Sequence, residues 1–347
     1  MLGCPASERR IPVPAAARVD PKSFFSEAEW ANLARRSVWR GPAMIAHAWI
    51  VIAAAAALFV LWPNPLTFIL AVLVIGARQL GLAILMHDGA HAALHPNMKV
   101  NDFIGFWLCG APVGAHLGRY RSYHLTHHKF AQQAEDPDLV LSKPFPITPV
   151  SFRRKALRDL TGQTFFKQRI APTIAAYRTR RAKGLSHEQV AEGLWNFWGP
   201  FVIANGVVWA ALTLAGLWWV YPSLWLLPMA TWYPLVTRVR NIAEHALVAQ
   251  DEPDPLRHAR TTRANLVERA LVAPYYVNFH CEHHMFMHLP CWRLPLAHRM
   301  LAAKGVLPRM EVAPDYLTVL RLATTNAVDR TGGRGRNANA EPVATFG

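Results

Sequence analysis

Two long apolar runs separated by three residues constrain this chain more than any other feature. The first covers residues 44–62, the second covers 66–85, and only "PNP" lies between them. Each approaches the ~20 residues that a helix needs to cross ~30 Å of hydrocarbon. Nothing polar alternates along either run, so we predict a hairpin of two membrane-spanning helices rather than two core helices of a soluble protein.

Two further apolar runs follow after a long gap. They cover residues 201–220 and 224–240 and are split by "YPS", which predicts a second spanning hairpin. A shorter apolar piece at 103–117 is broken by glycine and proline, so we interpret it as an interfacial or re-entrant segment. The expected fold is an all-α integral membrane protein with four transmembrane helices in two hairpins.

The distribution of basic residues predicts the orientation. The turns at 63–65 and 221–223 contain no Lys or Arg, whereas residues 119–183 contain 14 Lys or Arg against four acidic residues. The positive-inside rule then places this segment and both termini in the cytoplasm. The net charge of +15 suits anionic lipid headgroups. No interleaved aromatic or glycine motif favours a nucleic-acid partner.

The remaining sequence divides simply. Residues 1–43 carry charges and prolines without an early apolar core, so we expect a cytoplasmic N-terminal segment and no signal peptide. Residues 44–328 form one membrane domain, and the Gly-rich, small-polar tail at 329–347 is expected to be disordered. The four cysteines, which show no CxxC pair, are expected to be free thiols in a reducing compartment: Cys4, Cys109, Cys281 and Cys291.

Nine of the 16 histidines fall in places that the predicted topology brings to one side of the membrane. "HDGAH" contains His87 and His91, "HLTHH" contains His124, His127 and His128, and "HCEHH" contains His280, His283 and His284. His245 lies in "NIAEH", where the fourth run reaches the cytoplasm. Spacings of three and four place side chains within an arc of ~100° on a helix, so each triplet can aim three imidazoles at one point. His288 lies close to the third box, and we leave it outside the ligand set.

Nine imidazoles are too many for one ion, because zinc sites use three or four protein ligands. Two metals with four or five ligands each would account for them, held in a cytoplasmic helical cap above the membrane. Imidazole binds Zn, Cu, Fe and Ni, so ligand type alone does not identify the metal. Polar helix faces are the alternative for any single box, and the joint pattern argues against that alternative.

In this order, and around two hairpins, the three boxes resemble those of the integral-membrane fatty acid desaturase superfamily, over about residues 45–305. The resemblance implies a non-haem di-iron centre that activates O2 and removes hydrogen from an unactivated methylene. The implied iron ligands are His87, His91, His124, His127, His128, His245, His280, His283 and His284. The implied outer-shell candidates are Asp88, Asn241, Glu244, Asn278 and Glu282.

The resemblance also implies partners. No HPGG motif of a fused cytochrome b5 is present, so electrons are expected from a separate ferredoxin or cytochrome b5. The expected substrate is an acyl lipid or acyl thioester whose chain enters an apolar tunnel among the four helices. The spacing within the first box and His280 at the start of the third differ from two common desaturase branches, which leaves the substrate open.

Three functions are compatible with this pattern. A fatty acid desaturase is the main expectation, and a lipid or alkane hydroxylase or a carotenoid ketolase on the same scaffold is the first alternative. A zinc-dependent membrane hydrolase or a metal transporter is the second. A transporter needs polar residues at mid-membrane, where Arg78 and Gln79 are the strong candidates in the second run, although either could serve the tunnel or helix packing.

Overall fold

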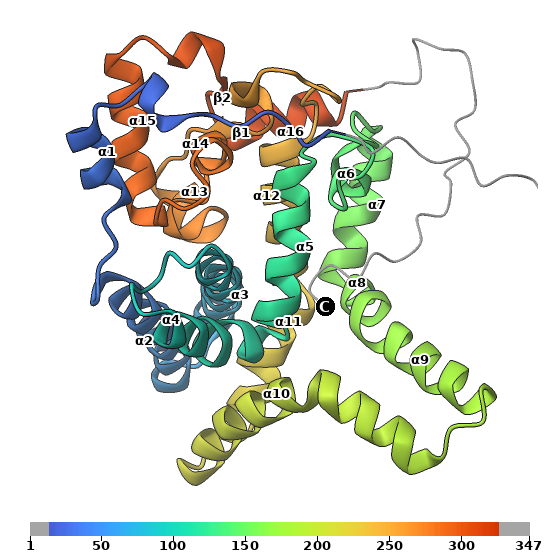
Figure 1. Ribbon diagram of the computed structural model, residues 1–347. Helices are drawn as coiled ribbons and strands as arrows, with labels where there is room; N and C mark the ends of the chain where they lie inside the picture. The colour runs from blue at the N-terminus through green and yellow to red at the C-terminus, as the bar shows by residue number, and fades with distance from the viewer. Residues whose placement is uncertain (1–13, 326–347) are drawn as a thin grey trace, which may run out of the picture.

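The computed structural model describes residues 14–325, which are mostly helical (Figure 1). The α-helices are α1 (Glu27–Ala34), α2 (Arg40–Leu61), α3 (Pro65–Ala90), α4 (Met98–Phe103), α5 (Leu117–Lys129), α6 (Leu139–Ser142), α7 (Pro149–Leu160), α8 (Gln163–Phe165), α9 (Ala171–Ala182), α10 (His187–Leu214), α11 (Leu227–Ala230), α12 (Trp232–His245), α13 (Leu266–Leu271), α14 (His280–Met285), α15 (Leu294–Ala303) and α16 (Tyr316–Ala323). Short 3-10 or π segments are η1 (Pro21–Ser23), η2 (Ile104–Gly110), η3 (Ala111–Val113), η4 (Phe166–Ile170), η5 (Tyr221–Leu226), η6 (Pro255–Arg257), η7 (Pro274–Tyr276), η8 (Cys291–Arg293) and η9 (Leu307–Arg309).

The first predicted hairpin is formed by α2 and α3, and both helices are long and apolar enough to cross a membrane. Asn64 begins α3 by accepting hydrogen bonds from the backbone N–H groups of Leu66 (3.0 Å) and Thr67 (3.1 Å). Pro65 follows at the first helical position, where its missing N–H costs nothing. The two helices pack closely because small residues, including Ala48 and Ala71, lie in the core that they share.

Helix α3 is the central element of the molecule. Every residue from Ile75 to Ala90 is buried, because α2, α5, α12 and η2 surround this part of the helix. Burial on all sides explains why the sequence of α3 shows no polar face. Its C-terminal end therefore delivers side chains to the interior of the protein rather than to solvent.

The second predicted hairpin differs from expectation. The third long apolar helix, α10, extends from His187 to Leu214 rather than over 201–220, and Gly216 follows with a φ of 72°. The fourth run, predicted at 224–240, is divided among η5, α11 and α12, with a break at Thr231. Pro228 and Pro234, both inside this run, lack the N–H that a continuous helix needs. Within residues 14–325, three helices are long and apolar enough to span a membrane: α2, α3 and α10.

The segment predicted to be interfacial, 103–117, is helical in short pieces. It contains η2 and η3, and Gly114 then turns the chain with a φ of 75° before α5 begins. One face of η2 packs on α3, whereas Phe103 and Leu108 remain exposed. A short helical segment with one buried and one exposed apolar face fits an interfacial position.

The part of the chain that follows α12 was expected to be helical, but it also contains two short strands, which corrects the all-α expectation. β1 (Arg260–Thr262) and β2 (Glu311–Ala313) form a two-stranded parallel sheet beside α14 and α16 (Figure 1). The structure confirms that Cys109, Cys281 and Cys291 are free thiols, all buried. Cys4 and the tail predicted to be disordered at 329–347 lie outside the described residues.

Gly41 allows α2 to begin against the backbone of Leu94. A Cβ at Gly41 would lie 2.1 Å from the Leu94 carbonyl oxygen, and backbone cannot yield as a side chain can. We therefore expect Gly41→Ala to destabilise the detergent-solubilised protein by about 1–3 kcal/mol, measured as a lower thermal unfolding midpoint. Gly206→Ala on α10 is the control, because nothing lies within 4 Å of its Cβ position. Equal midpoints for the two variants would contradict the close approach.

Candidate metal centre

Four separate elements bring nine histidines to one place. His87 lies near the C-terminal end of α3, and His91 is the C-cap residue of that helix. Helix α5 supplies His124, His127 and His128, α12 ends at His245, and α14 supplies His280, His283 and His284. All nine predicted ligands fall in groups whose candidate ligand atoms lie within 4.8 Å of one another. That they bind metal stays a prediction, but the convergence that such binding requires is present.

The histidines separate into two groups. The five-histidine group consists of His87, His91, His124, His128 and His283. His127, His245 and His284 form a second set, and His245 also lies with His280 and the Glu244 carboxylate in a third. Because these two sets share His245, we call their four histidines the four-histidine group. The division agrees with the expectation of two ions with four or five ligands each.

The nitrogen spacing suits a metal ion. In the five-histidine group, the Nε2 atom of His128 lies 3.0 Å from the Nε2 atoms of both His124 and His283. In the four-histidine group, the Nε2 atoms of His245 and His280 are 2.9 Å apart. Two imidazoles bound at right angles, each ~2.1 Å from an ion, would hold their nitrogens ~3 Å apart.

Several of these nitrogens lack any other partner. Both ring nitrogens of His87 and of His91 are buried without a hydrogen-bond partner among the described residues. Burial lowers the pKa of His91 to about 3 and lowers the pKa values of His124 and His283 well below the ordinary histidine value. Burial therefore favours the neutral form of these imidazoles, which is the form that binds metal. The donor set fits one ion in each group.

His127 is held differently, by a carboxylate that sequence analysis missed. Its Nδ1 atom lies 2.7 Å from the Asp136 carboxylate, which also accepts hydrogen bonds from the N–H groups of Gln132 (2.9 Å) and Asp138 (2.8 Å). Burial opposes a charge on His127, but the Asp136 carboxylate outweighs burial and raises the pKa of His127. The bond orients the ring so that Nε2 faces His284 at 3.2 Å, as carboxylate–histidine–metal arrangements require.

Two predicted outer-shell residues lie against the histidines. Glu244 Oε2 is 3.4 Å from His280 Nε2. Arg240 forms an ion pair with the same carboxylate, with Nη2 2.5 Å from Oε2 and Nε donating to Oε1 at 2.6 Å. Burial raises the pKa of Glu244 to about 7, although Arg240 opposes the rise. Asp88 lies 3.7 Å from His87 Nδ1 and accepts a hydrogen bond from the Cys291 N–H (2.9 Å), which joins α3 to η8.

Two others, Glu282 and Asn278, serve as anchors instead. Glu282 contacts the Thr261 hydroxyl and His298 Nδ1, and Asn278 donates to the Thr262 carbonyl (3.1 Å). These bonds attach the short helix α14 and the residues before it to β1 and α15. Both residues therefore help to position the third histidine box without contacting its histidines. Their bonded partners do not include any of the nine histidines.

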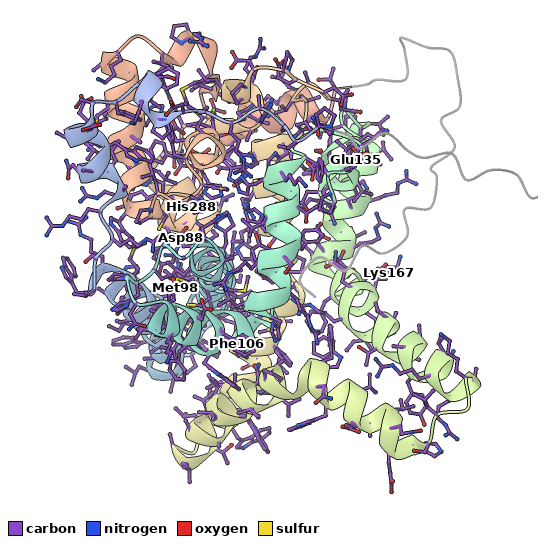
Figure 2. All side chains as sticks on the ribbon, in the orientation of Figure 1. Asp88, Met98, Phe106, Glu135, Lys167 and His288 are labelled. Atoms are coloured by element: carbon purple, nitrogen blue, oxygen red, sulfur yellow. The ribbon has the colours of Figure 1, made fainter. Side chains whose placement is uncertain are left out.

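The remaining assignments are mixed. His288, which Figure 2 labels, is exposed and belongs to neither histidine group. Its ring centroid lies 6.3 Å from that of His91. Asn241 lines a cavity that adjoins the histidines. Gln132, which was not predicted, has its Nε2 atom 3.3 Å from His245 Nδ1. The acidic stretch "EDPD" soon after the second box was the available signal for Asp136.

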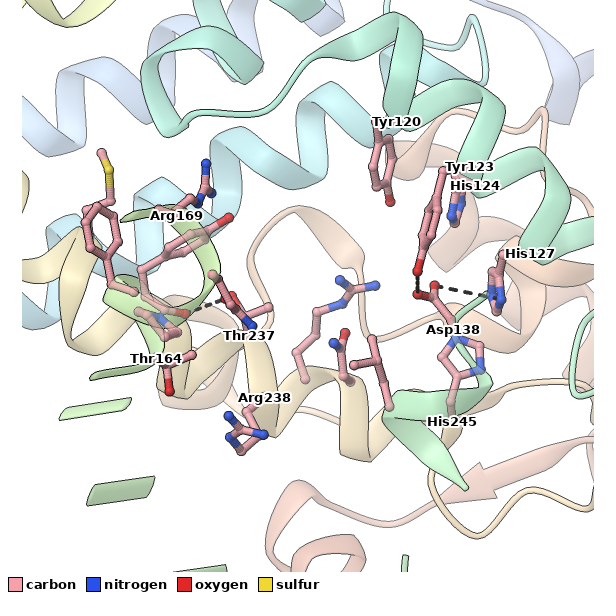
Figure 3. Close-up of a pocket in the computed structure, with 18 of the residues that line it drawn as sticks. Tyr120, Tyr123, His124, His127, Asp138, Thr164, Arg169, Thr237, Arg238 and His245 are labelled. Carbon is pink, nitrogen blue, oxygen red and sulfur yellow. Dashed lines mark hydrogen bonds and ion pairs between the residues drawn. The ribbon is translucent and has the colours of Figure 1, made fainter. Parts of the chain in front are cut away.

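This cavity, of ≈ 110 Å³, reaches the centre from the α5–α12 side (Figure 3). Four of the nine histidines line it: His124, His127, His245 and His280. In Figure 3, Tyr120 and Tyr123 enter from the same wall as His124 and His127, and Arg169 and Thr164 lie on the opposite wall. A neighbouring cavity of ≈ 290 Å³, lined by apolar residues of η4, α9 and α10, shares Phe165, Arg169 and Met229 with it.

Comparisons with known proteins agree with this geometry. Residues 61–313, which include all nine histidines, match the family described as fatty acid desaturase. The chain is 27% identical over 266 residues to dihydrorhizobitoxine desaturase of Bradyrhizobium elkanii, covering 75% of this chain and 74% of that protein. It is 25% identical over 260 residues to beta-carotene ketolase of Paracoccus sp. (strain PC1), covering 73% of this chain and 88% of that protein.

The role of Asp136 can be tested by metal binding. Asp136→Asn removes the charge that orients His127, so we expect about 10–100-fold weaker binding of the ion in the four-histidine group. Metal analysis after chelator challenge should then show one ion lost per chain and the other retained. Glu135→Gln, an exposed neighbour labelled in Figure 2, is the matched control and should keep both. Unchanged metal content in the Asp136 variant would refute the assigned role.

Proposed function

Because the chain belongs to the fatty acid desaturase family, we propose that it is a membrane-bound, O2-dependent acyl-lipid desaturase that holds two iron ions. One observation carries the proposal: nine imidazoles converge in two groups inside the matched region. One iron would be held by the five-histidine group and the other by the four-histidine group. Bound iron supplies the activation of O2 that removal of hydrogen from an unactivated carbon requires.

The two adjoining cavities support a route for an apolar substrate. The apolar cavity lies against Trp198, Phe201 and Val202 of α10, a helix apolar enough to meet lipid. It joins the histidine-lined cavity at Phe165 and Met229. The hydrocarbon part of a substrate that enters from lipid through the apolar cavity would present a carbon to the metal centre in the histidine-lined cavity.

The histidine-lined cavity differs from the apolar tunnel among four helices that we expected from the sequence. Its lining includes Tyr120, Arg240 and Asn241 beside the histidines. The hydroxyl of Tyr233, another lining residue, is buried and has no hydrogen-bond partner among the described residues. A buried hydroxyl without a partner favours a substrate that carries a polar atom able to form a hydrogen bond in this cavity. These polar groups would orient the substrate, and the surrounding burial would keep bulk water out.

Electrons are proposed to come from a separate ferredoxin or cytochrome b5. The segment α7–α9 is rich in Lys and Arg, and Arg153, Arg154 and Lys167 are exposed on it (Figure 2 labels Lys167). An acidic carrier would be attracted to such a face, as would anionic lipid headgroups. In the proposed orientation, this face, both termini and the metal centre lie in the cytoplasm.

A hydroxylase or ketolase is the second candidate. It uses the same centre, but after the first hydrogen abstraction it transfers oxygen to the substrate instead of abstracting a second hydrogen. The beta-carotene ketolase relative favours keeping it. The zinc-dependent hydrolase has less support, because the relatives found are named a desaturase and a ketolase.

The products distinguish these candidates. We expect that expression in a host of known lipid profile, with a competent electron donor, yields lipids that have lost two hydrogens each. Mass spectrometry of extracted lipids and carotenoids measures the change. A gain of oxygen instead would support the hydroxylase or ketolase, and no change in either class would contradict both.

Single ligand substitutions test both metal groups. We expect His127→Ala in one group and His283→Ala in the other each to abolish turnover and to lower the iron content from about two per chain, because each removes a first-row metal ligand. His288→Ala is the control and should retain both iron and activity. Near-normal activity in either ligand variant, or active protein that contains zinc alone, would overturn the assignment.

A further inference from the structure

A third and larger cavity, of ≈ 530 Å³, lies where the start of α2 meets α3, α13 and η7. It shares no lining residue with the cavity at the metal centre. Arg78, which lines it, precedes His87 by nine residues in α3, and at ~100° per residue the two side chains leave opposite sides of the helix. The cavity is therefore a separate site on the other side of α3.

The charge lining this cavity is unbalanced. Arg40, Arg78 and Arg269 all line it, and no Asp or Glu does. Within residues 14–325, none of the three arginines forms an ion pair, whereas Arg240 and Arg238 near the metal centre are paired with Glu244 and Asp159. Three cations around one cavity without a counter-charge favour an anionic ligand.

Arg78 carries the strongest part of the argument. It is only 7% exposed, and although its guanidinium donates to the Ala270 carbonyl (2.5 Å), its Nε has no hydrogen-bond partner among residues 14–325. Trp292, which also lines the cavity, has a buried Nε1 without a hydrogen-bond partner in the part of the chain that the structure describes. Both atoms are donors, so both lack an acceptor oxygen. Gln79, the polar neighbour in sequence, instead donates to the Trp225 carbonyl (2.7 Å) and serves helix packing.

An unusual backbone builds one wall of the cavity. Tyr275 and Tyr276 have φ values of 53° and 63°, a region that bulky residues rarely adopt. The Tyr275 ring lies 5.5 Å from the Arg78 guanidinium carbon, and the Tyr276 ring lies 5.3 Å from that of Arg269. Strained residues held in place by their surroundings are frequent at ligand sites, and here they hold two aromatic faces against two of the arginines.

We propose that this cavity binds the phosphate headgroup of an anionic glycerophospholipid. Arginine guanidinium groups match phosphate oxygens, and the donors of Arg78 and Trp292 would gain acceptors. The volume suits a headgroup rather than a whole diacyl lipid. The tails have a surface to follow, because Ile50 and Leu61 of α2 are 65% and 66% exposed and α2 is apolar enough to span the bilayer.

The position of the cavity agrees with a headgroup site. Trp39 and Arg40 stand at its rim, where α2 begins, and Trp39 is 63% exposed. Tryptophan and arginine are typical of the level at which a spanning helix enters the headgroup region. This inference goes beyond the proposed function, because it needs neither iron nor turnover.

The test measures lipid binding to the full-length protein in detergent. Native mass spectrometry and thermal unfolding would be recorded with phosphatidylglycerol, phosphatidylcholine, oleate or inorganic phosphate. We expect phosphatidylglycerol to bind and raise the unfolding midpoint, and phosphatidylcholine to bind at least tenfold more weakly. Oleate binding tighter than phosphatidylglycerol would replace the phospholipid with a free fatty acid, and binding of inorganic phosphate alone would overturn a lipid site.

Variants connect the binding to the cavity. Arg78→Gln removes the buried donor but could prevent folding, so the rim double variant Arg40→Gln/Arg269→Gln provides the second test. We expect the double variant to bind phosphatidylglycerol at least tenfold more weakly with an unchanged metal content. Arg158→Gln on α7, which lines neither this cavity nor those near the metal centre, is the control for loss of charge. An equal loss of binding in the control, or full binding in the rim variant, would refute the site.

Discussion

Convergence of neutral imidazoles in a buried space is the constraint on which the rest of this structure depends. A buried nitrogen without a hydrogen-bond partner is costly, and His87 and His91 each bury two. A bound metal would offset that cost, because it supplies the partner that the protein does not. The fold must therefore hold four distant pieces of chain rigidly enough to keep an arrangement that is unfavourable without the ion.

Carboxylates outside the cluster provide this rigidity in different ways. Asp136 fixes the ring of His127 and the turn after α5 together, and Glu244 couples His280 to Arg240. Glu282 does not act on a ligand, but it ties α14 to β1 and α15. Two of these carboxylates act on ligand rings and one acts on the helix that carries them. Loss of any one would therefore disturb a different part of the centre.

The sequence predicted what local periodicity controls and missed what tertiary contacts control. Spacings of three and four aim the eight histidines of the three boxes reliably, because helix geometry fixes them, and all eight lie in the groups that could hold a metal ion. His245 was predicted from its place after the fourth run and from the family resemblance, and it lies with them. Asp136 approaches His127 through a turn with Gln132 at a φ of 63°, and composition does not encode such a turn. The fourth apolar run looked continuous because hydropathy ignores the missing N–H groups of Pro228 and Pro234.

The arginines show how one helix can serve two sites. Near the metal centre, Arg238 and Arg240 are neutralised by carboxylates, and Arg169 donates to the Val113 and Gly114 carbonyls. Because these arginines already have protein partners, they can line a cavity that contains no bound anion. Among residues 14–325, Arg78 donates to the Ala270 carbonyl and lies against the Tyr275 ring but has no carboxylate partner, which is why we propose an anionic ligand for it. α3 is buried on all sides from Ile75 to Ala90, so its side chains there reach interior sites: His87 faces the candidate metal centre, and Arg78 faces the separate cavity on the opposite side of the helix.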